Sequence, residues 1–149
     1  MTRAGKSMPP QEFDGGILYY LSRLQRLTRG MLESELEKYN MSAPQFAAMN
    51  VVKRTGTITN AALARRSYVT PQTMYRIVSE LIDRGLLVNT DEPDGRSHPV
   101  RLTPKGEKML SDLDSAHRAV IAAMTGGDDE AADRFNDLLI KFCSNMDMK

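Results

Sequence analysis

The stretch from Thr70 to Gly85 constrains the fold of this chain most, because it carries both ends and the buried face of an amphipathic helix. The Thr70 hydroxyl can cap a helix N-terminus, and Pro71 has the backbone angle of a first helical turn and needs no amide partner there. Gly85 predicts the end of the helix. The apolar residues between them recur at helical spacing and must face a core: Met74, Ile77, Val78, Leu81 and Ile82.

The opposite face of this helix is polar, and its polar groups crowd toward the N-terminal end. They are Gln72, Thr73, Tyr75, Arg76 and Ser79. Amides and guanidinium groups pair with base edges, so this arrangement is typical of a recognition helix in a DNA major groove. Because any surface helix has a polar face, the interpretation depends on the flanking segments.

The segments on both sides complete a winged helix-turn-helix. Thr59 can cap a short helix of small residues at 61–64, and Ser67 to Val69 leave room only for a tight turn before the next helix. Thr57–Ile58 can supply a short extra strand.

After the helix, Leu86–Val88 and Val100–Leu102 are two short strands, and residues 91–95 have the composition of a hairpin tip. Arg96 and His98 follow the tip, where a wing can bring them to a phosphate backbone or a minor groove.

Four segments carry a family resemblance: Leu63–Ala64, Thr70–Thr73, Leu81–Leu86 and the run from Asp94 to Gly106. The last has the pattern D-x-R-x-x-x-V-x-L-T-x-x-G. Together they resemble the winged helix of MarR-family transcriptional regulators, and the D-x-R run is the most specific part. Motifs and helix order cover about residues 17–146.

Helical periodicity continues on both sides of this central segment. An apolar stripe runs along residues 17–39 and ends at Asn40, and Ser42–Gln45 has the S-x-x-Q form of a capping box. Two more helices are expected after the wing, one starting at Thr103 and one capped by Asp128. The simplest way to bury the terminal stripes is against each other and a second copy, which predicts a twofold dimer with recognition helices about 10 base pairs apart.

We therefore expect a mainly α (α+β) fold, a winged helix-turn-helix with N- and C-terminal dimerisation helices. Residues 1–14 are a flexible leader and 15–149 a single domain, with the winged helix at 42–106 and the dimerisation helices at 15–40 and 104–147. The resemblance implies a dimeric repressor that binds a pseudo-palindromic operator in double-stranded DNA and is released from it by an effector. The releasing effector would be a small aromatic or anionic molecule bound between the dimerisation helices and the winged helix.

The charge distribution agrees with DNA as the partner. Residues 53–105 hold nine Lys or Arg against five Asp or Glu, whereas residues 106–149 hold five against nine. No apolar run is long enough to span a membrane, no signal peptide is visible, and one cysteine fits a reducing cytoplasm. His98 and His117 have no partner at metal-ligand spacing and no catalytic set is visible, so we expect no enzyme, metal or cofactor.

The DNA-contacting residues are predicted on the two helices and the wing. They are Arg65, Arg66, Thr70, Gln72, Thr73, Tyr75, Arg76, Arg96, Ser97 and His98. No effector-binding residue is assigned, although Tyr20, Arg23 and Met49 can line the junction. Cys143 lies on the apolar stripe of the last helix, which predicts a buried core cysteine.

Two positions depart from the family pattern. Tyr75 stands where a small hydroxyl residue is common, so base preference cannot be transferred. Asn89 stands where an arginine often holds the wing aspartate, which leaves Arg101 and Arg84 as candidates to hold Asp94. Two alternative functions are a winged-helix module that binds a protein, and a redox or ligand sensor that acts through a protein partner.

Overall fold

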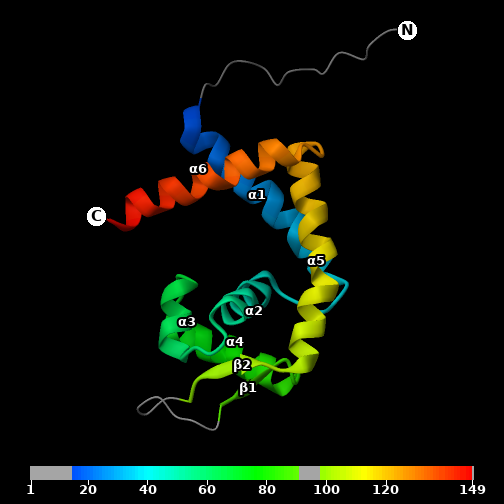
Figure 1. Ribbon diagram of the computed structural model, residues 1–149, viewed down its shortest axis with the longest axis vertical. Coiled ribbons are helices and arrows are strands. Elements are labelled where there is room, and N and C mark those ends of the chain that lie inside the picture. Colours follow the sequence, from blue (N-terminus) through cyan, green and yellow to red (C-terminus); the bar gives the residue numbers. More distant parts are fainter. Residues whose placement is uncertain (1–14, 91–97, 149) are drawn as a thin grey trace.

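The computed structural model describes residues 15–90 and 98–148. Its elements follow in the order α1 (Gly16–Glu37), α2 (Ala43–Thr55), α3 (Asn60–Arg66), α4 (Pro71–Asp83), β1 (Leu87–Asn89), β2 (Val100–Leu102), α5 (Pro104–Thr125) and α6 (Asp129–Asp147). Figure 1 shows α2, α3, α4 and the two strands gathered at one end of the molecule, with α1 and α6 at the other. Helix α5 runs along one side and connects these two parts.

The predicted starts of α2 to α6 are confirmed, because each rests on a local cap. The side chains of Thr59, Thr70, Thr103 and Asp128 each accept a hydrogen bond from the backbone N–H three residues later. At Ser42 the capping box is complete, since Ser42 Oγ accepts from the Gln45 N–H and Gln45 Oε1 accepts from the Ser42 N–H.

The two wing strands pair in antiparallel register, with Leu87 opposite Leu102 and Asn89 opposite Val100. The first strand begins one residue later than predicted, because the Leu86 N–H bonds to the Leu81 carbonyl and closes α4. The prediction of a third strand at Thr57–Ile58 is wrong, because the structure contains only a single bridge there. Ile58 forms only an isolated bridge, through two backbone hydrogen bonds to Val100.

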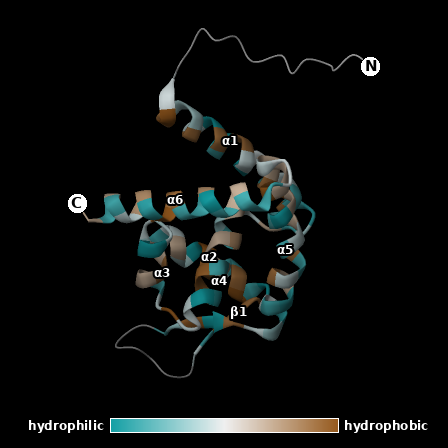
Figure 2. Cartoon of the chain, turned by 45° about the horizontal axis from the view of Figure 1, so that its top comes forward, coloured by the Kyte–Doolittle hydropathy of each residue, from teal (hydrophilic) through white to brown (hydrophobic). Residues whose placement is uncertain are grey.

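The core lies inside the winged helix, where the apolar faces of α2 and α4 meet the strands and the first half of α5 (Figure 2). Its largest fully buried side chains are Leu36, Met49, Val52, Leu63, Met74, Leu81, Leu86, Leu87 and Leu113. The predicted buried face of α4 is confirmed, except that Ile82 is only half-buried. These contacts hold the recognition helix rigidly against α2 and α3.

The terminal helices leave much of their apolar surface uncovered. Within the described chain, no residue of α6 is buried and Leu36 is the buried residue of α1. Exposed apolar side chains on the two helices include Ile17, Leu18, Tyr20, Leu27, Leu138, Ile140, Phe142 and Met146. The prediction of a buried Cys143 is wrong for the single chain, where it is exposed, because the described residues bury no side chain of α6.

Candidate nucleic-acid interface

Helices α3 and α4 form the helix-turn-helix, and two hydrogen bonds define its turn. Asn60 Nδ2, at the start of α3, donates to the Pro71 carbonyl oxygen at 3.1 Å, and the Val69 N–H donates to the Ala64 carbonyl at the same distance. Ala64 is buried, and its small side chain allows the two helices to approach closely. Tyr68 turns the chain with a positive φ of 55°, and its side chain is left exposed.

The N-terminus of α4 holds two of the predicted DNA contacts. Thr70 Oγ1 accepts a hydrogen bond from the Thr73 N–H at 3.1 Å, and the two threonine hydroxyls lie 2.9 Å apart. Thr70 is therefore an N-cap. The N-terminal end of α4 is also the positive end of the helix dipole, where binding of a phosphate is favoured. Donation from either hydroxyl to a phosphate stays a prediction.

The outward face of α4 presents Gln72, Tyr75 and Arg76, all exposed. Tyr75 is 69% exposed, which leaves a large ring accessible on this face. Arg76 Nη1 lies 3.2 Å from Glu80 Oε1, one helical turn further on, and Gln45 Nε2 of α2 donates to Glu80 Oε2 at 2.9 Å. The Glu80 carboxylate thus binds Arg76 within α4 and Gln45 of α2 at the same time.

The remaining predicted contacts lie beside this face or outside the described residues. Arg65 and Arg66 occupy the last turn of α3 and are exposed, so they flank the turn that leads into α4. His98 is exposed just before β2. Arg96 and Ser97 lie outside the described residues, and so does the hairpin tip. The structure therefore places six of the ten predicted residues on α3 and α4, Thr70 at the N-cap of α4 and His98 at the base of the wing.

The recognition helix is anchored by residues that the sequence did not single out as anchors. Arg84, which caps α4, donates from its two terminal guanidinium nitrogens, Nη1 to the carbonyl oxygen of Asn40 at 2.7 Å and Nη2 to that of Tyr39 at 3.2 Å. Lys105 Nζ donates to the Arg84 carbonyl at 2.8 Å, and the Thr103 hydroxyl donates to the Gly85 carbonyl. These bonds fix the turn between α4 and the wing. Arg84 was also a candidate to hold Asp94, which lies outside the described residues.

Of the contacts that position the site, the pairing of Arg76 with Glu80 follows the i, i+4 rule and could have been found from the sequence. The bond from Gln45 to Glu80 spans 35 residues, and no local pattern indicates it.

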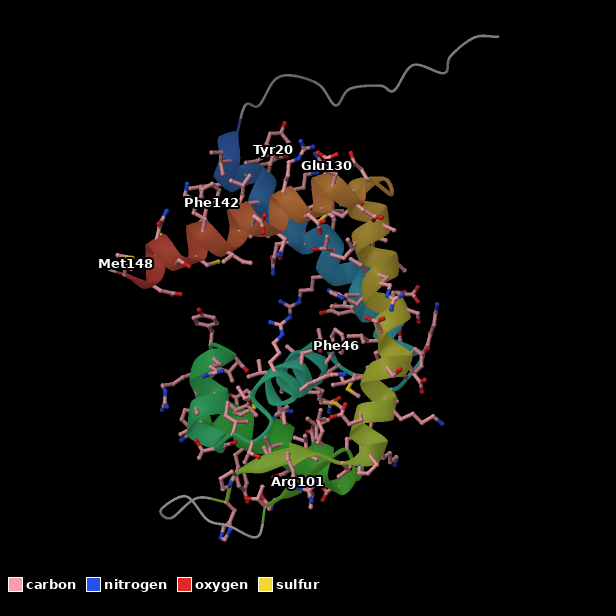
Figure 3. All side chains as sticks on the ribbon, viewed as in Figure 1. Tyr20, Phe46, Arg101, Glu130, Phe142 and Met148 are labelled. Carbon is pink, nitrogen blue, oxygen red and sulfur yellow. The ribbon has the colours of Figure 1, made fainter. Side chains whose placement is uncertain are left out.

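A cavity of about 800 Å³ lies between the terminal helices and α2. Its wall is mainly apolar and includes Leu24, Phe46, Val120 and Phe135, while Arg29, His117 and Asp133 are among the residues that contribute polar groups. Figure 3 shows Phe46 on the side of α2 that faces α5, and its ring centroid lies 6.4 Å from that of His117. Tyr20, Arg23 and Met49 are not among the lining residues, so the structure puts other side chains at this junction.

The described residues also bear on two other classes of function, metal binding and membrane insertion. No group of three or more His, Cys, Asp or Glu side chains is arranged to hold a metal ion in residues 15–90 and 98–148. None of the helices in that same part of the chain combines the length and the apolar character that a membrane span requires.

A helix-turn-helix followed by a two-stranded wing, with a basic residue on the outer face of its second helix, defines a winged helix-turn-helix protein. The model of the MarR family matches residues 39–97, which contain the helix-turn-helix and the first wing strand. Over this segment the chain is similar to the MarR family.

Curated and solved relatives agree with this assignment. The transcriptional repressor Rv2887 of Mycobacterium tuberculosis is 27% identical over 110 residues, which cover 73% of this chain and 79% of that protein. A MarR-family regulator from Silicibacter pomeroyi superposes with a TM-score of 0.79 at 23% identity, over 93% of this chain and 94% of its own. Rv2887 in complex with DNA gives a TM-score of 0.74 at 24% identity, covering 87% and 98% of the two chains.

Proposed function

We propose that this protein is a dimeric transcriptional repressor that binds a pseudo-palindromic operator and leaves it when a small aromatic or anionic molecule occupies the cavity. The match to the MarR family supports the part of this proposal that makes the chain a DNA-binding transcriptional regulator. The observation that carries the proposal is the outer face of α4, where Gln72, Tyr75 and Arg76 are exposed beside a capped helix N-terminus. These are the groups that pair with base edges and phosphates in a major groove.

Charge and relatives support DNA as the partner of this face. The segment 53–105 carries an excess of basic residues, and Arg65 and Arg66 extend the positive surface beyond α4. The relative Rv2887 is a repressor and has been solved with DNA. A winged helix that binds a protein partner is disfavoured, because three exposed arginines border the face that would have to be desolvated.

The exposed apolar faces of α1 and α6 support a dimer. Ile17 and Leu18 are 81% and 77% exposed, and Phe142 and Met146 of α6 are also exposed. Figure 3 shows Tyr20 and Phe142 on these two helices at the end of the molecule opposite the wing. A surface of this kind is covered when a second copy packs on it, and two copies would present two recognition helices to one operator.

The cavity has the chemistry for an aromatic carboxylate. Its apolar wall can take a ring, and Arg29 can pair with a carboxylate at the rim. In the single chain, Arg29 pairs instead with Glu33 at 2.9 Å, and both side chains are more than half exposed, so the competing ion pair is weak. Rv2887 has been solved with salicylic acid, at 25% identity and a TM-score of 0.70 over 87% of this chain and 97% of its own.

The experiment that tests the proposal is a selection of random duplex DNA by the purified protein, followed by titration of the best site at several salt concentrations. A pseudo-palindrome with half-sites about 10 base pairs apart and a steep fall of affinity with salt is the expected result. Enrichment of no sequence, with weak and unselective binding, would contradict it.

A further inference from the structure

The carboxylate of Glu80 connects two helices on the DNA side of the molecule. Its Oε1 accepts from Arg76 Nη1 at 3.2 Å, within α4, and its Oε2 accepts from Gln45 Nε2 at 2.9 Å, across to α2. Both oxygens are thus engaged, and by donors that lie on different elements. The Glu80 side chain is 44% exposed and that of Arg76 67% exposed, so this chain of contacts contributes little to stability.

Gln45 is held at both ends of its side-chain amide. Its Oε1 accepts from the Ser42 N–H at 3.1 Å as part of the capping box, and this bond directs Nε2 toward Glu80. The backbone of Gln45 is fixed as well, because its own N–H donates to Ser42 Oγ at 3.2 Å. The amide that meets Glu80 is therefore part of the rigid start of α2.

We propose that Gln45 is a positioning residue that orients Arg76 for contact with a base, acting through Glu80. This inference rests on the proposed function. A guanidinium group has five N–H donors in one plane, and Glu80 occupies one nitrogen, Nη1. The other donors of Arg76 have no partner among the described residues and can form a bidentate pair with guanine, in a plane that the carboxylate sets.

The same contact has a second effect on binding. A carboxylate beside Arg76 repels phosphates, so it limits what this arginine adds to unselective attraction to DNA. Gln45 and Glu80 together therefore serve the choice of sequence more than affinity.

The test compares the operator profiles of wild-type protein, Arg76→Ala and Gln45→Glu, measured with every base pair of one half-site substituted in turn. Gln45→Glu keeps the acceptor for the Ser42 N–H, so the capping box stays intact, but it replaces the donor to Glu80 by a second carboxylate. Arg76→Ala identifies the base pair that depends on the arginine. At that pair we expect Gln45→Glu to lose discrimination by about 5-fold or more, with unselective binding changed less than about 2-fold.

A reciprocal variant separates positioning from a structural role. Gln45→Glu combined with Glu80→Gln exchanges the donor and the acceptor of the bond between α2 and α4, so that this bond can form again. The side-chain amide oxygen introduced by Glu80→Gln can still accept from Arg76. We expect the double variant to recover most of the lost discrimination. The Gln45→Ala variant, which keeps the Ser42 Oγ cap on the backbone, should lose discrimination at the same pair.

Three results would overturn the inference while leaving DNA binding in place. One is full discrimination by Gln45→Glu where Arg76→Ala has lost it. Another is an Arg76→Ala profile without any affected base pair. The third is a uniform loss of affinity in Gln45→Glu that tracks a lower melting temperature and is not rescued by Glu80→Gln. Wild-type protein that selects no sequence would instead overturn the proposed function itself.

Discussion

The guanidinium group of Arg84 donates a hydrogen bond of 2.7 Å to the backbone carbonyl oxygen of Asn40, which lies 44 residues earlier in the chain. Asn40 has a positive φ of 52° and lies in the turn that ends α1, and its neighbour Tyr39 accepts a second bond from Arg84 at 3.2 Å. The end of the recognition helix is thus tied to the end of the first helix. A movement of α1 must therefore either carry α4 with it or break these bonds.

Replacing Arg84 by alanine should lower the free energy of unfolding by about 1–3 kcal/mol, because two carbonyl oxygens lose a charged donor. Urea titration followed by circular dichroism measures the change. Arg84→Lys is the matched control: it keeps the charge but cannot form the fork, so its loss should be smaller. Equal stability of Arg84→Ala and wild type would show that the two bonds contribute nothing.

Gly106→Ala should destabilise the junction between α5 and the wing. A Cβ at this position would lie 2.2 Å from the Leu86 carbonyl oxygen and 3.0 Å from Leu102 Cδ2, so the backbone must shift. We expect a loss of about 1–3 kcal/mol in unfolding free energy. Gly30→Ala in the interior of α1 meets nothing within 4 Å and should gain about 0.5–1 kcal/mol. A tolerated Gly106→Ala would contradict the close packing seen here.

Thr70 variants can separate its role as a cap from a role at DNA. Thr70→Ala removes the acceptor for the Thr73 N–H and should lower the unfolding free energy by about 1 kcal/mol. Thr70→Asp keeps the cap, so stability should be retained, but its charge faces the phosphates expected at the end of α4. We expect Thr70→Asp to bind the selected operator at least about 10-fold more weakly. Unchanged binding by this variant would place the N-terminus of α4 away from DNA.

A bulky side chain in the cavity should stop the effector from releasing the protein from DNA. Ala47 lines the cavity from α2 and is itself exposed, so Ala47→Trp adds bulk to the cavity without entering the core. With sodium salicylate as the probe, wild-type protein should release its operator and Ala47→Trp should stay bound, with DNA affinity in the absence of salicylate preserved. Ala123→Trp, on the exposed surface of α5 and outside the cavity lining, is the control. Release of both variants at the same salicylate concentration would place the effector elsewhere.

A charge on the apolar stripe of α6 should separate the proposed dimer. Phe142 is 52% exposed in the single chain, and burial in an interface would make a carboxylate there costly. Sedimentation should show a dimer for wild type and a monomer for Phe142→Glu, which should also bind the palindrome more weakly. Lys141→Glu, next to it but off the stripe, should stay dimeric. A dimeric Phe142→Glu would exclude this face as the interface.

The local features of this chain could be predicted from its sequence, because they depend on interactions between residues close together in the chain. The caps at Thr59, Thr70 and Thr103, and the capping box at Ser42, formed as expected. Hydrophobic periodicity also identified the buried face of α4, and with it the exposed face that carries Gln72 and Arg76.

The sequence by itself therefore determined the order of the helices, the winged helix-turn-helix and the exposed face of α4 on which the DNA contacts are predicted. Tertiary structure decided which distant groups hold that face: Gln45 reaches Glu80, and Arg84 reaches Asn40. It also reduced the third strand to a bridge at Ile58 and left Cys143 exposed. The physical reason is twofold. An apolar stripe shows that a surface must be covered, but it does not show which element covers it. Polar contacts between residues 35 or 44 positions apart form only after the helices have packed.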